Sequence, residues 1–226
     1  MTVAVRFSAE PETVRRATAE DTERIARLFA AAFHSDPVFN WLLRDGPQRM
    51  RALQRFFSWA VQRRTMPHGE TWISANRLAA AAWIPPYSTA QPRLADDLRM
   101  LPIVLRLTGL QRLARGAALA AAMEETRPRE RHFYLAFLGV APRLQGSGWG
   151  SALLERTLAR IDATGANAYL DNSNPRNLPL YQRYGFEVVG EVIARSDAPP
   201  LYAMWRPARG RKSDADQGSS TISQYK

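Results

Sequence analysis

Several residue types and patterns are missing from this sequence. None of the 226 residues is cysteine, which excludes disulfides, thiolate metal ligands and an acyl-cysteine intermediate. No run of about 18 apolar residues occurs, so no segment is long enough for a transmembrane helix. The first residues, MTVAVRFSAEPETVRR, lack the apolar core of a signal peptide. Together these absences predict a cytoplasmic protein with no membrane-bound part.

Lysine is nearly absent as well, because Lys212 and Lys226 are the only two among 31 basic residues. The formal net charge of +10 is of the kind found in nucleic-acid-binding proteins. However, the arginines are scattered among acidic residues, and the only local basic cluster is Arg209-Gly-Arg211-Lys212. This distribution disfavours a nucleic-acid groove, whereas positive surroundings would raise the local concentration of a small polyanionic ligand.

The hydrophobic content of 46% is sufficient for a packed core. We expect one domain over residues 11–207, with a loose lead-in at 1–10. Residues 208–226 have no apolar pattern and are expected to be a disordered tail. Residues 93–126 are rich in leucine, alanine and arginine and are expected to form helices inserted into the domain.

Apolar patterning predicts a mixed α/β fold. Thr18-Ala-Glu-Asp21 is typical of a capping box, and a helical apolar stripe follows until Asp36-Pro37 breaks it. The segment HFYLAFLGV, at 132–140, is apolar nearly throughout, which indicates a central strand buried on both faces. Further strands are expected at 13–17, 71–75, 78–84, 168–171, 186–194 and 201–206, and further helices at 48–64, from the glycine run to 163, and at 178–184.

Three glycines, Gly146, Gly148 and Gly150, lie between the predicted central strand and the helix that follows it. A helix N-terminus exposes backbone N–H groups without partners and carries a partial positive charge, so it binds anions. Glycine lets a phosphate approach those amides closely. A tight structural turn would need only one glycine, whereas three glycines in a first helical turn cost about 1 kcal/mol each relative to alanine. The run therefore favours a pyrophosphate site.

Two common phosphate-binding patterns fit poorly. No lysine lies near the glycines, which excludes the P-loop motif, G-x-x-x-x-G-K-[ST]. The spacing G-x-G-x-G also departs from G-x-G-x-x-G, and too few residues follow for the rest of a doubly wound sheet.

Two motifs carry a resemblance to a known family. Arg143-Leu-Gln-Gly146-Ser-Gly148 resembles the [QR]-x-x-G-x-[GA] acetyl-CoA signature of the GCN5-related N-acetyltransferases, the GNAT superfamily. About 30 residues later, 177-NLPLYQRYGF-186 resembles the second marker of that family, N-x-x-x-Y-x-x-x-G-F. The resemblance covers roughly 14–206 and implies a mixed, mostly antiparallel sheet with one splayed pair of strands, flanked by helices. The segments 173-SNPRNLPLYQRYGF-186 and 83-WIPP-86 further resemble the branch typified by puromycin N-acetyltransferase.

The resemblance also implies a cofactor, acetyl-CoA, and its contacts. Pantetheine is expected between the splayed strands, against the backbone of Leu138, Gly139 and Val140, and one N–H at Leu138 or Gly139 would polarise the thioester carbonyl. The remaining cofactor contacts are expected from Arg143, Gln145, Gly146, Ser147, Gly148, Trp149, Gly150 and Asn177.

The implied catalysis is direct transfer of the acetyl group to an amine. Tyr181 is the predicted general acid for the departing thiolate, and it shares a helix face with Asn177. Many relatives place a glutamate on the strand before the glycine loop, but HFYLAFLGV contains none. An amine of pKa about 10.4 must lose a proton, so a base is expected. Asp171 is the leading candidate, and the others are Glu124, Glu125, His34 and His132.

The acceptor remains open at this level. A small-molecule amine, such as an antibiotic, is the first prediction; the alternatives are a protein or peptide amine and a non-catalytic module that binds acetyl-CoA. Four aromatic residues are candidates for a substrate wall or for ordinary core: Phe33, Phe39, Trp41 and Trp83. The helices in 93–126 would form a lid or a dimer contact, so both a monomer and a homodimer are compatible with the sequence. No spacing of histidines or acidic residues indicates a metal site.

Overall fold

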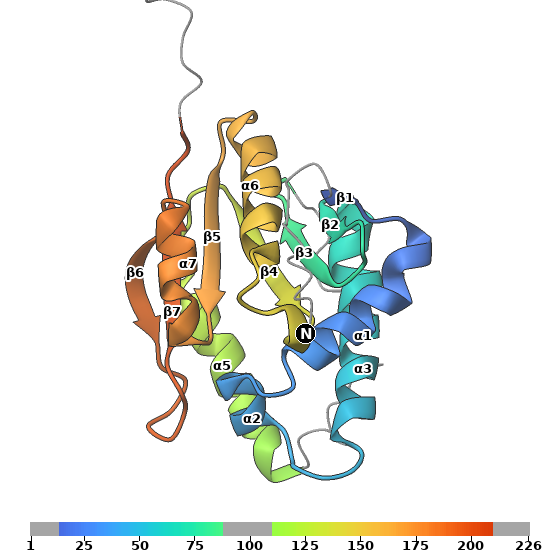
Figure 1. The fold of residues 1–226 in the computed structure, drawn as a ribbon. Coiled ribbons are helices and arrows are strands. Elements are labelled where there is room, and N and C mark those ends of the chain that lie inside the picture. Colours follow the sequence, from blue (N-terminus) through green and yellow to red (C-terminus); the bar gives the residue numbers. More distant parts are fainter. Residues whose placement is uncertain (1–13, 88–109, 210–226) are drawn as a thin grey trace, which may run out of the picture.

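The computed structural model describes residues 14–87 and 110–209, which form one seven-stranded sheet with helices on both faces (Figure 1). Every neighbouring pair of strands is antiparallel except β4 and β5, which run parallel. The mixed, mostly antiparallel sheet expected from the sequence is therefore confirmed. In spatial order the strands are β1 (Val14–Arg16), β2 (Thr71–Ser74), β3 (Ala79–Ile84), β4 (His132–Val140), β5 (Asn167–Asn172), β7 (Leu201–Arg206) and β6 (Glu187–Val192).

The helices divide between the two faces because successive residues of a strand point to opposite sides. On β3, Ala79 and Ala81 pack against α6, whereas Ala80 and Ala82 pack against α1 and α3. The face toward α6 also receives α7, and α2 and α5 extend the opposite layer over β5, β6 and β7. The bounds are α1 (Thr22–Ala32), α2 (Pro37–Leu42), α3 (Arg49–Ala60), α5 (Leu110–Thr126), α6 (Trp149–Asp162) and α7 (Leu178–Arg183).

Strands β4 and β5 pair only where both begin. His132–Tyr134 pairs with Asn167–Tyr169, and beyond these residues β4 pairs with β3 alone. β5 meanwhile continues to Asn172 paired with β7. The two central strands therefore separate, which is the splay that the sequence resemblance implied.

The Asp36-Pro37 break marks the start of a helix as well as the end of one. Asp36 is the N-cap of α2, and its Oδ1 accepts hydrogen bonds from the amides of Val38 at 2.9 Å and Phe39 at 3.1 Å. Proline is favoured at the first helical position because its missing N–H has no partner there in any case. The sequence pattern indicated the break but not this six-residue helix.

The predictions for the two ends of the chain and for the helical insertion at 93–126 fall largely outside the residues that the structure describes. The part of 93–126 that the structure describes is helical, as α5. The predictions for 1–10, 93–109 and 210–226 lie outside the described residues. Within 14–87 and 110–209, no helix is long and apolar enough to cross a membrane. The same residues contain no group of three or more histidines and carboxylates placed to hold a metal ion.

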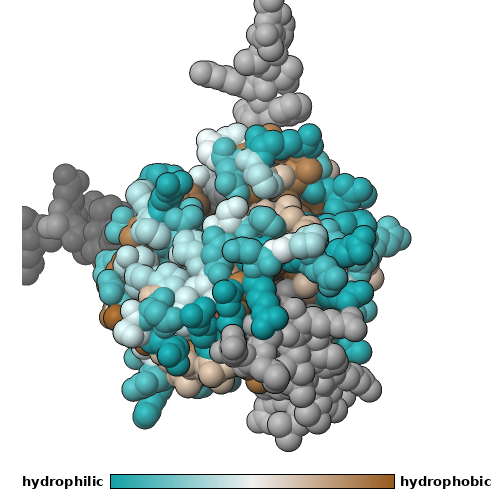
Figure 2. Space-filling model, turned by 90° about the horizontal axis from the view of Figure 1, so that it is seen from below, coloured by the Kyte–Doolittle hydropathy of each residue, from teal (hydrophilic) through white to brown (hydrophobic). Residues whose placement is uncertain are grey.

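The surface seen from below in Figure 2 is mostly hydrophilic, with hydrophobic residues in small separate patches. Monomeric proteins commonly leave such scattered apolar residues exposed. On this face the described residues thus offer no large apolar area to a partner.

The capping box at the start of the domain leads to a prediction about acid stability. Asp21 is 3% exposed, and its carboxylate accepts hydrogen bonds from Arg15 at 2.7 and 3.0 Å and from the Thr18 amide at 2.9 Å. The hydrogen bonds from Arg15 lower the pKa of Asp21 to about 2. An unfolded aspartate titrates near 3.9, so this carboxylate stabilises the fold above that pH, and the stabilisation is lost as the pH falls toward 2.

We therefore expect Asp21→Asn to lower the free energy of unfolding by about 1–2 kcal/mol at pH 7, a value reduced because Arg15 is 42% exposed. The difference from the wild type should shrink in urea titrations near pH 2. Glu20→Gln, at an exposed neighbouring carboxylate, is the control. A pH-independent difference between Asp21→Asn and the wild type would contradict the prediction.

Candidate active site

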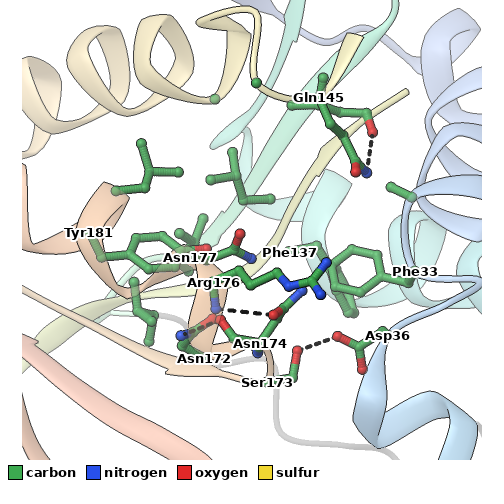
Figure 3. Close-up of a pocket in the computed structure, with 18 of the residues that line it drawn as sticks. Phe33, Asp36, Phe137, Gln145, Asn172, Ser173, Asn174, Arg176, Asn177 and Tyr181 are labelled. Atoms are coloured by element: carbon green, nitrogen blue, oxygen red, sulfur yellow. Dashed lines mark hydrogen bonds between the residues drawn. The ribbon is translucent and has the colours of Figure 1, made fainter. Parts of the chain in front are cut away.

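A cavity of about 600 Å³ opens where β4 and β5 separate (Figure 3). Small-molecule sites generally enclose roughly 300–1,000 Å³. Its walls come from β4, the end of β5 and the loop after it, the segment joining α1 and α2, the glycine run and α7. The separation of the two strands therefore creates the candidate site.

The glycine run forms one end of this cavity. Gly146 has φ 78°, and Gly148, the N-cap of α6, has φ 92°; both are left-handed values that favour glycine. A Cβ atom at Gly146 would meet nothing within 4 Å, so the space beside its backbone is open. The first amides of α6 have no partner inside the helix and carry its partial positive charge. This end of the cavity fits an anionic ligand.

Most of the predicted site residues line the cavity, and four do not. Gly139 faces α1, where an added Cβ would lie only 2.6 Å from Cδ1 of Phe29, so its role is close packing. Trp149 is 4% exposed and belongs to the core beside α6. Arg143 is exposed, and Ser147 donates its hydroxyl hydrogen to the Leu144 carbonyl at 2.5 Å. The nine that line the cavity are Leu138, Val140, Gln145, Gly146, Gly148, Gly150, Asp171, Asn177 and Tyr181.

Backbone groups of β4 face the gap between the strands. The Ala141 amide donates to the Leu78 carbonyl at 2.8 Å, on the β3 side. Successive residues of an antiparallel strand direct their N–H and C=O groups to alternate sides, so Gly139 also faces β3, whereas Leu138 and Val140 face the cavity. In agreement, Nε2 of Gln145 donates to the Val140 carbonyl at 3.3 Å.

Tyr181 projects from α7 toward the cavity and is 7% exposed (Figure 3). Its ring packs against Phe186 with centroids 6.0 Å apart. Burial, together with the nearby charge of Asp36, raises the pKa of Tyr181 above its ordinary value. The hydroxyl therefore remains protonated at neutral pH. In the described part of the chain it has no hydrogen-bond partner, so it is available to a ligand.

The five candidate bases separate clearly in the structure. Only Asp171 lines the cavity. Glu124 and Glu125 are exposed on α5, and the His34 side chain does not reach the cavity wall. The His132 ring lies between Tyr169 and Trp205, with centroids 5.3 and 5.6 Å away, outside the lining. The geometry thus retains one of the five.

Asp171 is held by neighbouring hydroxyl groups. Tyr169 donates to its Oδ1 at 2.6 Å, while Oδ2 is buried and has no hydrogen-bond partner among the described residues. Burial raises the pKa of Asp171, and the Tyr169 and Tyr134 hydroxyls and the charge of Arg127 offset part of that rise. Oδ1 of this carboxyl thus has a fixed partner, and the carboxyl as a whole lies buried beside the hydroxyls of Tyr169 and Tyr134.

A second carboxylate, Asp36, lines the cavity and was not among the predicted residues. It is 8% exposed, and its Oδ2 accepts the hydroxyl hydrogen of Ser173, which follows β5 (Figure 3). Burial raises the pKa of Asp36 despite its three hydrogen bonds. The sequence feature that could have identified Asp36 is its place immediately before a proline, because this pattern is typical of a helix N-cap as well as of a helix break.

Of the four aromatic wall candidates, only Phe33 lines the cavity, where Phe137 stands beside it with ring centroids 6.0 Å apart. Phe39 packs among other phenylalanines, and Trp83 is 1% exposed in the core. Trp41 donates from Nε1 to Asp197 at 3.2 Å, away from the cavity.

This sheet, and the cavity between its splayed strands, define the N-acetyltransferase fold class. The model of the acetyltransferase (GNAT) family matches residues 72–186, about half of the chain, and the chain belongs to this family.

The similar proteins agree with this assignment. A mycothiol acetyltransferase of Propionibacterium freudenreichii is 34% identical over 82 residues, which are 35% of this chain and 25% of that protein. An uncharacterized N-acetyltransferase of Schizosaccharomyces pombe is 34% identical over 94 residues, or 40% of this chain and 38% of that protein. The matches thus span well under half of the curated relatives.

A solved Corynebacterium glutamicum structure, described as histone acetyltransferase HPA2 and related acetyltransferase, has a TM-score of 0.66 at 24% identity and covers 88% of this chain and 98% of its own. Arylalkylamine N-acetyltransferase 2 of Aedes aegypti has a TM-score of 0.59 at 13% identity, with 87% and 98% covered. At these identities the structures establish the fold.

Proposed function

We propose that the chain is an acetyl-CoA-dependent N-acetyltransferase, formed by one domain over 11–207, that transfers an acetyl group directly to a primary amine of a small molecule. The observation that carries the proposal is that the start of α6, Tyr181 and two carboxylates line one and the same cavity. The family generally uses acetyl-CoA, and the open space beside Gly146 fits a pyrophosphate.

The proposed cofactor contacts follow the geometry of the cavity. Leu138 and Val140 would pair with pantetheine through their backbone, and the Leu138 N–H is the proposed donor to the thioester oxygen. Gly139 would act through packing, because its amide faces β3. Ser147 and Trp149 would contribute backbone amides, Asn177 and Gln145 their side-chain amides, and Arg143 its exposed charge.

The proposed proton transfers use three groups of the chain. Asp171, or Asp36 through the Ser173 hydroxyl, takes the proton of the acceptor amine, whose nitrogen then attacks the thioester carbon. The C–N bond forms as the C–S bond breaks, and Tyr181 supplies a proton to the departing sulfur. Both carboxylates have raised pKa values, and this brings a base closer to the pH at which it must work.

A cavity of about 600 Å³ is in the size range of sites for small molecules, which favours a small acceptor over a protein substrate. Fold neighbours include an arylalkylamine N-acetyltransferase and a polyamine N-acetyltransferase of Drosophila melanogaster, which supports a small amine. The description of the Corynebacterium glutamicum structure names a histone acetyltransferase, so a protein amine is the second candidate. An antibiotic amine remains a candidate within the first class.

A thermal-shift measurement tests the cofactor. A ligand at 100 times its Kd stabilises a protein by about 2.7 kcal/mol, so acetyl-CoA should raise the Tm by roughly 5–10 °C. Gly146→Ala should reduce this shift, because the new Cβ would occupy the open space beside the backbone. Gly165→Ala is the matched control: Gly165 has φ 66° with no atom within 4 Å of an added Cβ, and it lies outside the cavity.

Both variants should lower the basal Tm similarly through backbone strain. Only Gly146→Ala should weaken the response to acetyl-CoA. A wild-type protein whose Tm does not rise with acetyl-CoA would contradict the proposed function. If the Tm rises, release of CoA in the presence of a panel of amines would support the proposed transfer.

A further inference from the structure

One wall of the cavity is the short segment that joins α1 to α2. Phe33, Ser35 and Asp36 of this segment line the cavity, on the side opposite Tyr181 in Figure 3. The segment, 33–36, belongs to neither helix, so no regular pattern of backbone hydrogen bonds fixes it. The position of this wall therefore depends on contacts with other parts of the protein.

Arg49, the first residue of α3, holds the segment from outside the cavity. Its Nη2 donates to the His34 carbonyl at 2.9 Å and to Oδ1 of Asn40 at 2.6 Å. The Asn40 side chain donates in turn to the Ser35 carbonyl at 3.4 Å. Arg49 does not line the cavity, so it acts on the site only through the residues that it holds.

The guanidinium of Arg49 is a buried charge whose hydrogen-bond partners are neutral. Arg49 is 7% exposed, and its ion-pair partner, Asp45, lies 3.7 Å from Nη1 with a side chain that is 98% exposed. Nη1 itself has no hydrogen-bond partner within the described residues. A buried charge is costly, and apolar residues in its place are often as stable or more so. Stability alone explains this arginine poorly, whereas a planar guanidinium holds two acceptors in one geometry.

The two ends of the segment depend on Arg49 to different degrees. The Phe33 ring also stacks on Phe57 of α3, with centroids 5.4 Å apart, so aromatic packing holds it without Arg49. The Asp36 carboxylate accepts hydrogen bonds from amides of α2 and from Ser173, and none of these groups belongs to α3. Loss of Arg49 should therefore displace Asp36 more than Phe33.

We propose that Arg49 is a positioning residue for the acceptor: it holds the segment 33–36, and with it Asp36, where the acceptor amine binds and loses its proton. This inference rests on the proposed function. Groups that take a proton must be held closely, and a misplacement of about 1 Å by a distant substitution lowers a rate by about 100-fold. The hydrogen bonds and the ion pair of Arg49 reach neither the glycine run nor α7. Its loss should therefore spare the binding of acetyl-CoA.

Arg49→Met, which removes both hydrogen bonds, tests the proposal with 2-phenylethylamine or spermidine, whichever amine the wild type acetylates faster. We expect kcat/KM for the amine to fall by about 10- to 100-fold, while the calorimetric Kd of acetyl-CoA stays within about twofold. Arg49→Lys keeps the charge and a donor and should recover part of the loss. Asn40→Leu, a milder change at an exposed residue, removes one acceptor and should lower kcat/KM by about 3- to 10-fold.

Hydrogen exchange gives a readout that needs no acceptor. The amides of 33–40 should exchange faster in Arg49→Met than in the wild type, and those of 145–150 should not. Asp21→Asn is the control, because it also weakens the fold but lies outside the cavity lining; its kinetic constants and the exchange of 33–40 should match the wild type.

Unchanged exchange of 33–40 in Arg49→Met would overturn the proposal. A wild-type kcat/KM for the amine in that variant, or an equal weakening of acetyl-CoA binding, would overturn it as well. A wild type without an acetyl-CoA thermal shift would instead count against the proposed function.

Discussion

Replacement of Tyr181 by phenylalanine is expected to lower kcat by about 100- to 1,000-fold, the usual effect of removing a general acid. The hydroxyl is the only group removed, and it has no hydrogen-bond partner in the described part of the chain, so the fold should be unaffected. KM for acetyl-CoA should change little, because the ring still fills its place against Phe186. Steady-state kinetics with a saturating amine measure the effect.

The pH profile gives a second readout for Tyr181. Burial raises the pKa of Tyr181 above the ordinary value near 10. At any pH below about 10, the wild type should therefore lose no activity through deprotonation of this hydroxyl. Tyr184→Phe is the control, because the Tyr184 hydroxyl donates to the Ser151 carbonyl at 3.0 Å and lies outside the cavity lining. A Tyr181→Phe variant with wild-type kcat across the profile would remove Tyr181 from the chemistry.

The largest expected loss of stability follows Arg206→Met. Arg206 is 2% exposed; its guanidinium donates to both Asp162 oxygens at 2.6 and 2.8 Å and to the Tyr184 carbonyl at 2.8 Å. One side chain on β7 thus joins the ends of α6 and α7, the two helices that carry the glycine run and Tyr181. Methionine would fill the space but leave a carboxylate and a carbonyl without their donor.

We expect the free energy of unfolding to fall by about 3 kcal/mol, the lower end for a broken buried pair because Asp162 is 26% exposed. Urea unfolding measures it. The ion pair of Arg195 with Asp197 at 3.2 Å is exposed on both sides, so Arg195→Met should lower the free energy of unfolding far less than Arg206→Met does. Equal losses of unfolding free energy in Arg206→Met and Arg195→Met would contradict the prediction that only the buried ion pair stabilises the fold strongly.

The sequence predicted the long elements well because their patterns are locally complete. The strands at 132–140 and 201–206 have the predicted bounds, since an unbroken apolar run in the first and a turn before the second define them. α2 was missed because six residues are too few to show a helical period. Its start was nevertheless encoded, in an aspartate before a proline.

The residues of the candidate site also fall into those that the sequence could predict and those that it could not. The residues near Gly146 and Tyr181 are neighbours in motifs, so spacing alone was enough to find them. Asp36 and Ser173 are 137 positions apart and meet only through the fold. Glu124 and Glu125 were plausible bases until the structure placed them on the outer side of α5, and no short pattern reports which side of a helix faces a distant cavity.

The separation of β4 and β5 has a consequence for the protein before it meets its cofactor. From Leu135 to Val140 on β4, and from Leu170 to Asn172 on β5, each strand pairs on one side only. The sheet therefore contains two additional edges in its interior, beside the two at its ends. Exposed strand edges are templates for pairing with other chains. A bound pantetheine would cover the interior ones, so acetyl-CoA should keep the concentrated protein from aggregating as well as serve the reaction.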